Sequence, residues 1–455
     1  MARHFDLAII GTGSGNSIVD DRFADWDVAI LEKGTFGGTC LNFGCIPTKM
    51  FVYPADLALS ARTAGRLGVR TSYDGVHWRE VRDRIFGRID PISAAGRDWR
   101  ADANENVTLF EGHARFLDAH TIDTGTGEPI TADQVVIAAG GRPAVPGVAG
   151  LDEVGYHTSD TVMRVDELPE RALIIGGGFV AAEFAHVFGA FGTEVTIAAR
   201  SSLMLRAEDR EVAERFTEIA HDRWDLRIDT EVAKLERTDD GVVAHLTDGS
   251  TLHTDLVLLA VGRRSNADGL DLDRAGVRTD EDDVIVVDEH QHTGVDGIWA
   301  LGDISNHFQL KHVSNHEARV VQHNLLHDRG SWVSASHDVV PSAVFSHPQV
   351  ASVGLTEEQA RERGLPYVVA RQDYGGTAYG WAMEDTRHFA KLLAEPGTGR
   401  ILGAHVIGPQ AANLVQPLIQ AMSFGQTAHD VARGQYWIHP ALMEVVENLL
   451  LGVPD

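Results

Sequence analysis

Cysteine is scarce in this chain, since only Cys40 and Cys45 among its 455 residues carry a thiol. A secretory signal is missing too, because the first ten residues lack the basic, apolar and cleavage regions of such a peptide. We therefore expect a cytoplasmic enzyme. In that setting, an isolated pair of neighbouring cysteines is the first clue to the chemistry.

Long apolar runs and positive charge are also in short supply. The longest apolar runs, such as 172–178 and 257–262, have the length of strands, which excludes a membrane span. Lys and Arg total 39 against 66 Asp and Glu, and the charge of -27 is spread along the chain, so nucleic acid is not an expected partner. At roughly 150 residues per domain, the length predicts about three folded units.

A glycine-rich turn follows the first predicted strand. Residues 4–10 alternate toward a buried strand, Gly11-Thr12-Gly13-Ser14-Gly15 interrupts it, and a helix is expected to begin near Asn16. Glycines let the backbone approach a diphosphate, which the free N–H groups of a helix N-terminus attract. A second strand, 27–32, ends at Glu32, whose carboxylate can accept hydrogen bonds from an adenosine ribose. Asn16 stands where the usual motif has its third glycine.

The same order of strand, glycine turn, helix and strand recurs downstream. It comprises a strand over 172–175, the turn Gly176-Gly177-Gly178, a helix through Gly189 and a strand over 194–199. We therefore expect two Rossmann-type units with parallel, doubly wound sheets. Two nucleotide ligands follow from that architecture.

The end of the second strand in this downstream unit indicates which nucleotide it binds. Ala199 takes the place of the acidic ribose ligand of NAD-binding folds, and Arg200 and Arg206 follow it. Two guanidinium groups can pair with the 2′-phosphate of NADP(H), which predicts that cofactor. The alternative is that both arginines are solvated loop residues.

Cys40 and Cys45 lie directly after the strand that ends at Glu32. Two cysteines five positions apart around a glycine can close a small ring only at a strained or distorted helix start, and so small a ring gains little stability. A cytosolic disulfide of this kind favours a catalytic role. A metal site is not expected, because two thiolates without a nearby histidine are an incomplete ligand set.

A histidine close to the end of the chain has suitable chemistry for a proton donor. Pro440 suits the first position of a helix, which predicts His439 at the cap and Glu444 somewhat more than one turn later. Taken alone, His439 has the pattern of a surface or packing histidine. Reduction of a disulfide, however, needs a proton donor for the leaving thiolate, and imidazole titrates in the right range.

After residue 338 the pattern changes to strand-like runs followed by amphipathic helices. The runs are 367–371, 390–394 and 401–407, and the helices are expected from Ala412 onward. This order predicts an α+β domain. The expected fold class is therefore α/β, with two Rossmann-type nucleotide-binding domains and a C-terminal α+β domain.

Further segments extend these motifs along almost the whole chain. They are 137–143 (IAAGGRP), 260–263 (AVGR), 300–303 (ALGD) and 353–357 (VGLTE). Together they resemble the FAD-dependent class I pyridine nucleotide-disulfide oxidoreductases, a family that includes glutathione reductase and dihydrolipoamide dehydrogenase. The resemblance implies an FAD-binding domain over 1–146, an NADPH-binding domain over 147–264, a central domain completing the FAD site over 265–337, and a homodimerisation domain over 338–455.

The resemblance also implies roles for single residues. Cys45 would lie next to the flavin, and Cys40 would attack the substrate disulfide. His439, oriented by Glu444, would protonate the departing thiol from the other subunit of a homodimer. Lys49 would pair with Glu183 near the flavin N5. The implied nucleotide-binding positions are Gly11, Gly13, Ser14, Gly15, Glu32, Thr39, Lys49, Ala114, Asp303, His312, Gly176, Gly177, Gly178, Val180, Glu183, Arg200, Arg206 and Gly262.

Two departures from the family pattern concern the flavin and the nicotinamide. Residues 310–313 read Leu-Lys-His-Val where relatives usually have a sequence like Leu-Thr-Pro-Val. A helix N-terminus facing the flavin there would stabilise negative charge with backbone groups. Phe179 stands where relatives often have a gating tyrosine, and its apolar ring can still exclude water.

The number of cysteines and the local sequence matches narrow the choice of substrate. Mercuric reductases and the larger thioredoxin reductases need a further redox pair near the C-terminus, which this chain lacks, and soluble transhydrogenases lack the first cysteine. Segments 10–17, 311–324 and 432–440 are most similar to a branch that reduces the disulfide of a sugar-linked thiol. The alternatives are a dihydrolipoamide dehydrogenase or another small-disulfide reductase and, more distantly, a non-catalytic flavin-binding protein with an inert disulfide.

Overall fold

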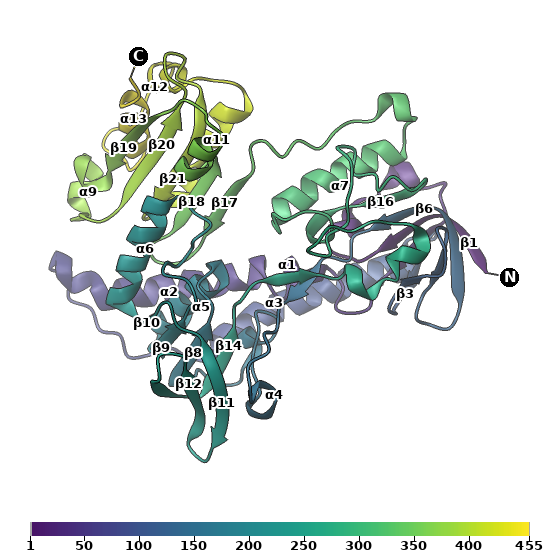
Figure 1. Ribbon diagram of the computed structural model, residues 1–455, viewed down its shortest axis with the longest axis horizontal. Helices are drawn as coiled ribbons and strands as arrows, with labels where there is room; N and C mark the ends of the chain where they lie inside the picture. Colours follow the sequence, from purple (N-terminus) through teal and green to yellow (C-terminus); the bar gives the residue numbers. More distant parts are fainter. Residues whose placement is uncertain (1, 455) are drawn as a thin grey trace.

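The structure is a computed structural model that describes residues 2–454. The chain is organised around three main sheets (Figure 1). The first includes the purple N-terminal strands, the second is teal, and the third is the yellow-green C-terminal sheet. In this view the third sheet stands well apart from the first.

The first sheet has seven strands in the order β3-β2-β1-β6-β5-β4, with β16 also paired to β6. Its strands are β1 (Arg3–Ile10), β2 (Val28–Leu31), β3 (Val107–Phe110), β4 (Arg115–Phe116), β5 (Thr121–Asp123), β6 (Pro129–Ile137) and β16 (Ile298–Ala300). β1, β2, β3, β6 and β16 are parallel, whereas β4 and β5 are antiparallel additions. All of β2 is buried, as expected for a parallel strand covered on both faces.

The prediction of a helix that begins near Asn16, between β1 and β2, is wrong. This segment forms only two short 3₁₀ helices, Gly15–Ser17 and Asp21–Phe23. The Asp20 side chain accepts a hydrogen bond from the Arg22 backbone N–H and so starts a new turn. Short polar side chains favour such local bonds over a continuous helix. The parallel pairing of β1 with β2 is nevertheless as predicted.

The second sheet has the order β10-β9-β8-β14, and all its strand pairs are parallel. Its strands are β8 (Arg171–Ile175), β9 (Glu194–Ala198), β10 (Asp225–Arg227) and β14 (Leu256–Leu259), and an antiparallel sheet nearby contains β11 (Val232–Thr238), β12 (Gly241–Leu246) and β13 (Thr251–Thr254). Here the predicted helix is present, because α5 (Phe179–Phe191) follows the glycine turn and is almost wholly buried. The other helices are α4 (Leu151–Val154) and α6 (Arg210–Arg223), and we call these sheets and helices together the second region. A strand pair, β7 (Gly141–Pro143) with β15 (Arg263–Ser265), links the second region to the region of the first sheet.

Two long helices run along the second region and toward the first sheet (Figure 1). They are α2 (Cys45–Thr63) and α3 (Trp78–Asp98), and the short α1 (Gly38–Asn42) precedes them. The Phe51 ring of α2 lies 5.0 Å from the Trp78 ring, which lies 6.1 Å from Phe188 of α5. This aromatic core fixes α2, and with it the start of α2 at Cys45, against the second region.

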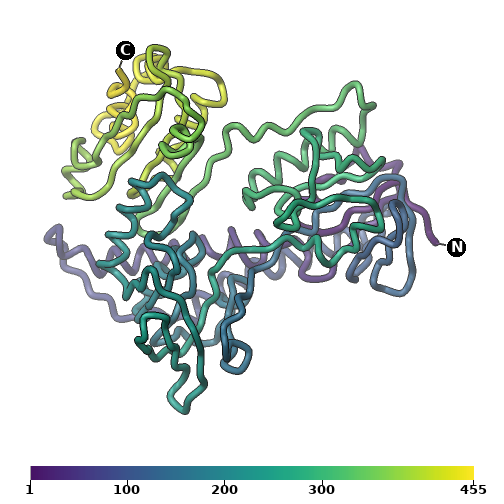
Figure 2. The backbone as a smooth tube through the Cα atoms, viewed as in Figure 1, coloured from purple at the N-terminus to yellow at the C-terminus, as the bar shows by residue number. Residues whose placement is uncertain are grey.

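The third sheet is antiparallel, with five strands in the order β17-β18-β21-β20-β19. Its strands are β17 (Pro341–Val344), β18 (Val350–Gly354), β19 (Val368–Asp373), β20 (Phe389–Ala394) and β21 (Ile401–Ile407). Its helices are α8 (Glu357–Glu362), α9 (Ala378–Ala382), α10 (Ala411–Leu414), α11 (Gln416–Ser423), α12 (Ala428–Arg433) and α13 (Glu444–Leu451). An open segment connects α7 (Lys311–Leu325), beside the first sheet, to β17 (Figure 2).

The predicted fold class is confirmed, with two Rossmann-type parallel sheets and a C-terminal α+β region. Within residues 2–454, no helix is both long enough and apolar enough to cross a membrane. The domain divisions after residues 146, 264 and 337 stay predictions, as does the cytoplasmic location.

Candidate active site

Both cysteines lie where two helices meet. Cys40 is in α1, Cys45 is the first residue of α2, and Gly44 between them leaves the helical path with φ −134° and ψ −113°. Helix α2 therefore starts separately from α1, and the distorted helix start predicted for a closed Cys40–Cys45 ring stays a prediction. Both side chains are free thiols, so the structure represents the dithiol state of the pair.

The two thiols perturb each other's acidity. The Cys40 thiol donates a hydrogen bond to Cys45, and this bond, with the Lys49 charge and the backbone N–H at the start of α2, lowers the pKa of Cys45 to about 7. The same bond, together with burial, raises the pKa of the Cys40 thiol well above its ordinary value. Near neutral pH, Cys45 is poised as a thiolate, whereas Cys40 needs an external base before it can attack a disulfide.

One turn beyond Cys45, the Lys49 ammonium points toward the second region. It lies 2.8 Å from both carboxylate oxygens of Glu183 in α5, so the predicted ion pair is present. Glu183 is buried and also accepts a hydrogen bond from the Phe345 backbone N–H, just after β17. Helix α2, helix α5 and the C-terminal region thus meet at one charge pair close to the thiols.

The first glycine loop leaves room for a diphosphate. Gly11 has φ +104°, and a Cβ atom there would stand 2.4 Å from the Ala138 carbonyl oxygen, so only glycine fits. Beside Gly13, in contrast, such an atom would have no neighbour within 4 Å. Gly15 is buried against Ala138 and the Ile9 side chain. A closely packed loop with one open side fits a diphosphate that approaches the backbone N–H groups.

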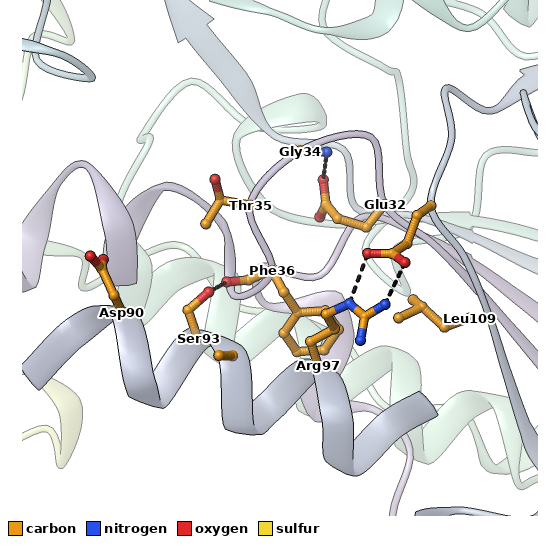
Figure 3. A pocket seen from close by; sticks show the side chains of 10 residues that line it. Glu32, Gly34, Thr35, Phe36, Asp90, Ser93, Arg97 and Leu109 are labelled. Carbon is orange, nitrogen blue, oxygen red and sulfur yellow. Dashed lines mark hydrogen bonds and ion pairs between the residues drawn. The ribbon is translucent and has the colours of Figure 1, made fainter. Parts of the chain in front are cut away.

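Glu32 directly follows β2 and lines a cavity of about 300 Å³ (Figure 3). Its Oε2 atom accepts hydrogen bonds from the backbone N–H and the hydroxyl of Thr12, and its Oε1 atom accepts one from the Gly34 backbone N–H. A carboxylate offers about four lone-pair positions, so Glu32 retains capacity for a ribose hydroxyl. The cavity is lined by Glu32, Gly34, Thr35, Phe36, Asp90, Ser93, Ala94, Arg97, Leu109 and Glu111.

Asp303 lies in a 3₁₀ turn, Gly302–Ile304, directly after β16. Buried Glu317 of α7 fixes this turn, because its Oε2 atom accepts a 2.7 Å hydrogen bond from the Gly302 backbone N–H. Burial raises the pKa of Asp303, although the Arg263 and Lys311 charges oppose this shift. Its carboxylate has no side-chain hydrogen-bond partner within residues 2–454. A half-buried carboxylate with free acceptor positions fits the hydroxyl groups of a ribityl chain.

Three other positions expected to contact FAD come from three separate segments of the chain. Thr39 is in α1 directly before Cys40, and Ala114 is buried in the loop after β3. His312 is the second residue of α7, and its ring Nε2 lies 2.8 Å from the Pro341 carbonyl oxygen. The His312 side chain therefore holds the start of β17, which leaves its backbone N–H, in the first turn of α7, as the group available to a flavin.

The second glycine loop repeats the geometry of the first. Gly176 has φ +127°, and a Cβ atom there would stand 2.2 Å from the Ala260 carbonyl oxygen, whereas Gly178 and Gly262 face open space. Helix α5 begins directly after these glycines with Phe179, whose ring is about half exposed, and Val180. The free N–H groups of this helix start fit a second diphosphate.

The predicted 2′-phosphate ligands lie next to this loop. Gly177 packs against the buried Ala199, and its carbonyl oxygen accepts a 2.7 Å hydrogen bond from the Leu205 backbone N–H, which draws the 200–206 loop toward the glycines. Arg200 and Arg206 on that loop are exposed. Neither has a carboxylate partner among the described residues, so both guanidinium groups are available to a phosphate.

His439 and Glu444 form a pair at the opposite end of the chain. The His439 Nδ1 atom lies 2.6 Å from Glu444 Oε1, and the His439 side chain is 71% exposed. The expectation that Pro440 begins a helix is wrong, because α13 starts only at Glu444. The Glu444 carboxylate also accepts a hydrogen bond from the Ala441 backbone N–H, so residues between His439 and Glu444 form a turn closed by that carboxylate. In Figure 1, α13 lies far from α1 of the same chain.

Two protein-family models match this chain. Residues 5–318 match the family described as pyridine nucleotide-disulphide oxidoreductase, and residues 340–450 match the dimerisation domain of the same family. The chain belongs to the pyridine nucleotide-disulphide oxidoreductases.

Relatives within the pyridine nucleotide-disulphide oxidoreductases match over nearly the full length. The chain is 55% identical over 457 aligned residues to mycothione reductase of Mycobacterium tuberculosis, with 99% of both proteins covered. It is 33% identical to glutathione reductase of Burkholderia cepacia, with 97% of both covered. The solved structure of the HOCl-induced flavoprotein disulfide reductase RclA from Escherichia coli matches with a TM-score of 0.86 at 29% identity and covers 99% of this chain and 100% of that chain. The predicted class, an NADPH-dependent flavoprotein disulfide reductase with FAD as cofactor, is confirmed.

Sequence reasoning missed two side chains at the FAD site of this oxidoreductase. The Thr12 hydroxyl joins Glu32 to the Gly37 backbone N–H, but Thr12 occupies a position that the glycine motif leaves unspecified. Lys311 donates a 2.8 Å hydrogen bond to the Ser14 hydroxyl in the glycine loop, across 297 positions of sequence. The departure of Lys311 from the family pattern was a signal that this position is unusual, but nothing in the sequence showed where its ammonium lies.

Proposed function

We propose that this protein reduces mycothione, the disulfide of the sugar-linked thiol mycothiol, with NADPH through the Cys40–Cys45 pair. The observation that carries the proposal is the dithiol itself, at the junction of α1 and α2, with the pKa of Cys45 lowered to about 7. The choice of substrate rests on 55% identity to a mycothione reductase over 99% of the chain.

The residues around the glycine loop fit FAD. The Gly11 to Gly15 loop would hold its diphosphate, Glu32 its adenosine ribose and Asp303 its ribityl chain, with Thr39 and Lys49 beside the flavin ring. When bound, FAD transfers an electron pair from NADPH to the Cys40–Cys45 disulfide. Arg200 and Arg206 would hold the 2′-phosphate of NADPH.

The dithiol then reduces the substrate in two exchanges. A Cys40 thiolate attacks one sulfur of the substrate disulfide, the substrate S–S bond breaks, and the first thiol leaves with a proton from an imidazolium. The Cys45 thiolate attacks Cys40 in the resulting mixed disulfide and expels the second thiol as a thiolate, which takes up a proton from solvent. Two electrons have then moved from the dithiol to the substrate, and the enzyme disulfide has formed again.

The imidazole would come from a second copy of the chain. Cys40 is protonated in the dithiol and needs a base, yet α13, which begins five residues after His439, lies far from α1 of the same chain (Figure 1). Tyr436 and Ile438 beside His439 are large exposed side chains, as is Phe424, which favours burial against another surface. A homodimer in which His439 and Glu444 of the partner subunit face Cys40 would satisfy both requirements, and the match to a dimerisation domain supports it.

A steady-state assay with NADPH tests the substrate. We expect kcat/KM for mycothione to exceed the values for glutathione disulfide and lipoamide. Equal or better turnover of either competitor would contradict the assignment, and NAD⁺-linked oxidation of dihydrolipoamide would favour a lipoamide dehydrogenase instead. Anaerobic titration with NADPH that fails to produce two titratable thiols would indicate an inert disulfide.

A further inference from the structure

The connection between β1 and β2 lacks the helix whose positive end usually faces a bound diphosphate. An α-helix presents roughly half a positive charge at its N-terminus, together with free N–H groups. Here the three-residue 3₁₀ helix Gly15–Ser17 follows the glycine loop instead. So short an element supplies little of that charge, although the FAD diphosphate must still be stabilised.

Side chains from elsewhere satisfy the carbonyl groups that a helix would have bonded internally. The buried Arg100 guanidinium donates hydrogen bonds to the carbonyl oxygens of Asn16 and Val19, at 2.7 Å and 3.0 Å. The Gln322 amide of α7 donates to the Ile18 carbonyl oxygen at 2.6 Å. The segment is therefore ordered by its neighbours, and α7 is one of them.

Lys311, the first residue of α7, adds a contact between α7 and the glycine loop. Its ammonium donates a 2.8 Å hydrogen bond to the Ser14 hydroxyl, which in turn donates to the Asn315 side-chain oxygen at 3.3 Å. Ser14 is buried, in the loop that would carry the diphosphate. The Lys311 charge also acts on Asp303, whose pKa it lowers against the effect of burial. The ammonium thus contacts the glycine loop assigned to the diphosphate, and its charge reaches Asp303, which is assigned to the ribityl chain.

We propose that Lys311 binds the FAD diphosphate and supplies the positive charge that the missing first helix does not. Ser14 and Asn315 are positioning residues that hold the ammonium at the mouth of the loop. A diphosphate diester carries two negative charges, so a lysine ammonium beside it forms a charge-assisted hydrogen bond. This inference rests on the proposed function, because it places FAD in the first glycine loop.

Release of FAD from the holoenzyme tests the proposal without measuring turnover. Upon dilution, Lys311→Met should release FAD about 10- to 100-fold faster than the wild type, detected as a gain in flavin fluorescence, because one charge-assisted hydrogen bond is lost. Lys311→Arg should retain FAD nearly as well as the wild type. Lys234→Met, the same change at an exposed lysine of β11, is the matched control and should leave the release rate unchanged.

The flavin reduction potential distinguishes a lysine at the diphosphate from one at the flavin ring. The charge of the diphosphate does not change when the flavin is reduced, so the potential of Lys311→Met should shift far less than expected for loss of a charge beside the flavin ring. A shifted potential with an unchanged release rate would overturn the proposal, as would equal loss of FAD from Lys311→Met and Lys311→Arg. If Lys311→Met purifies without FAD while Lys311→Arg retains it, the proposal is supported. Wild-type protein that binds no FAD would instead contradict the proposed function itself.

Discussion

The low pKa of Cys45 has several causes, which outweigh the opposing effect of burial. The largest contribution is the hydrogen bond from Cys40, followed by the Lys49 charge and the backbone N–H at the start of α2. Cys40 has the opposite shift because it is the donor of that bond and is partly buried. The difference in pKa between the two thiols is thus present before any substrate binds.

Removing the Cys40 thiol should weaken the acidity of Cys45. In Cys40→Ala the donated hydrogen bond is lost, so the pKa of Cys45 should rise from about 7 toward the ordinary value of about 8.5. The rate of iodoacetamide alkylation of the reduced protein, measured across pH by mass spectrometry, reports this pKa. In the reciprocal variant Cys45→Ala, the raised pKa of Cys40 should fall toward the ordinary value. An unchanged midpoint for Cys45 would show that the bond from Cys40 is not its main cause.

His439 should matter for turnover but not for the transfer of electrons from NADPH to the flavin. We expect His439→Gln to lower kcat for disulfide reduction by about 10²- to 10⁴-fold, because the departing thiolate loses its proton donor. Stopped-flow reduction of the flavin by NADPH should keep its wild-type rate. His245→Gln is the matched control, since His245 pairs with Glu236 at 2.9 Å outside the site. A His439 variant with normal turnover would exclude the assigned role.

At the residue scale, the sequence predicts most of the site because its motifs are local. Cys40 and Cys45 lie within six consecutive positions, and Glu32 and His439 stand at fixed places in their motifs. Contacts such as that between Lys311 and Ser14 join segments that only the fold brings together. The pKa directions of the thiols likewise depend on which thiol donates, and no spacing rule contains that information.

At the scale of elements, a buried charge cluster ties β20 to the start of α6. The Lys391 ammonium lies 2.9 Å from Asp209 Oδ1 and 2.7 Å from Glu357 Oε2, and both Lys391 and Asp209 are almost fully buried. Asp209 also accepts the capping hydrogen bond of α6 from the Glu211 backbone N–H. The C-terminal sheet is thus attached to the second region by charges that water scarcely reaches.

Breaking this cluster should cost far more stability than breaking an exposed pair. Lys391→Met leaves Asp209 buried without its cation, and we expect the free energy of unfolding in urea to fall by about 3–5 kcal/mol. The control is Lys234→Met, whose exposed pair with Glu236 should be worth less than about 1 kcal/mol. Equal losses of unfolding free energy in the two variants would mean that burial does not determine how much Lys391 contributes to stability.

Two helix predictions failed for a shared physical reason. A side chain with a carboxylate closes a local turn where the pattern predicts a helix: Asp20 does so before Arg22, and Glu444 does so after His439. Local hydrogen bonds of this kind compete with helix formation, and periodicity alone does not reveal them. The strands and α5 were predicted correctly because burial on both sides sets their pattern.

At the scale of the whole molecule, each active site should need two chains. Homodimers of Cys40→Ser and of His439→Ala should both be inactive, since each lacks one member of every site. Co-expression in equal amounts should yield hybrids with one complete site, and the mixture should recover about a quarter of wild-type activity. Failure of the hybrids to recover activity would show that His439 does not act across the interface.

Trapping of the mixed disulfide tests the central claim most directly. Reduced Cys45→Ser protein, treated with mycothione, should gain the mass of one mycothiol on the peptide that contains Cys40, because the resolving thiolate is absent. The Cys40→Ser protein should gain none, and glutathione disulfide should give far less adduct with Cys45→Ser than mycothione does. No adduct on Cys40, or equal adduct from glutathione disulfide, would contradict the account.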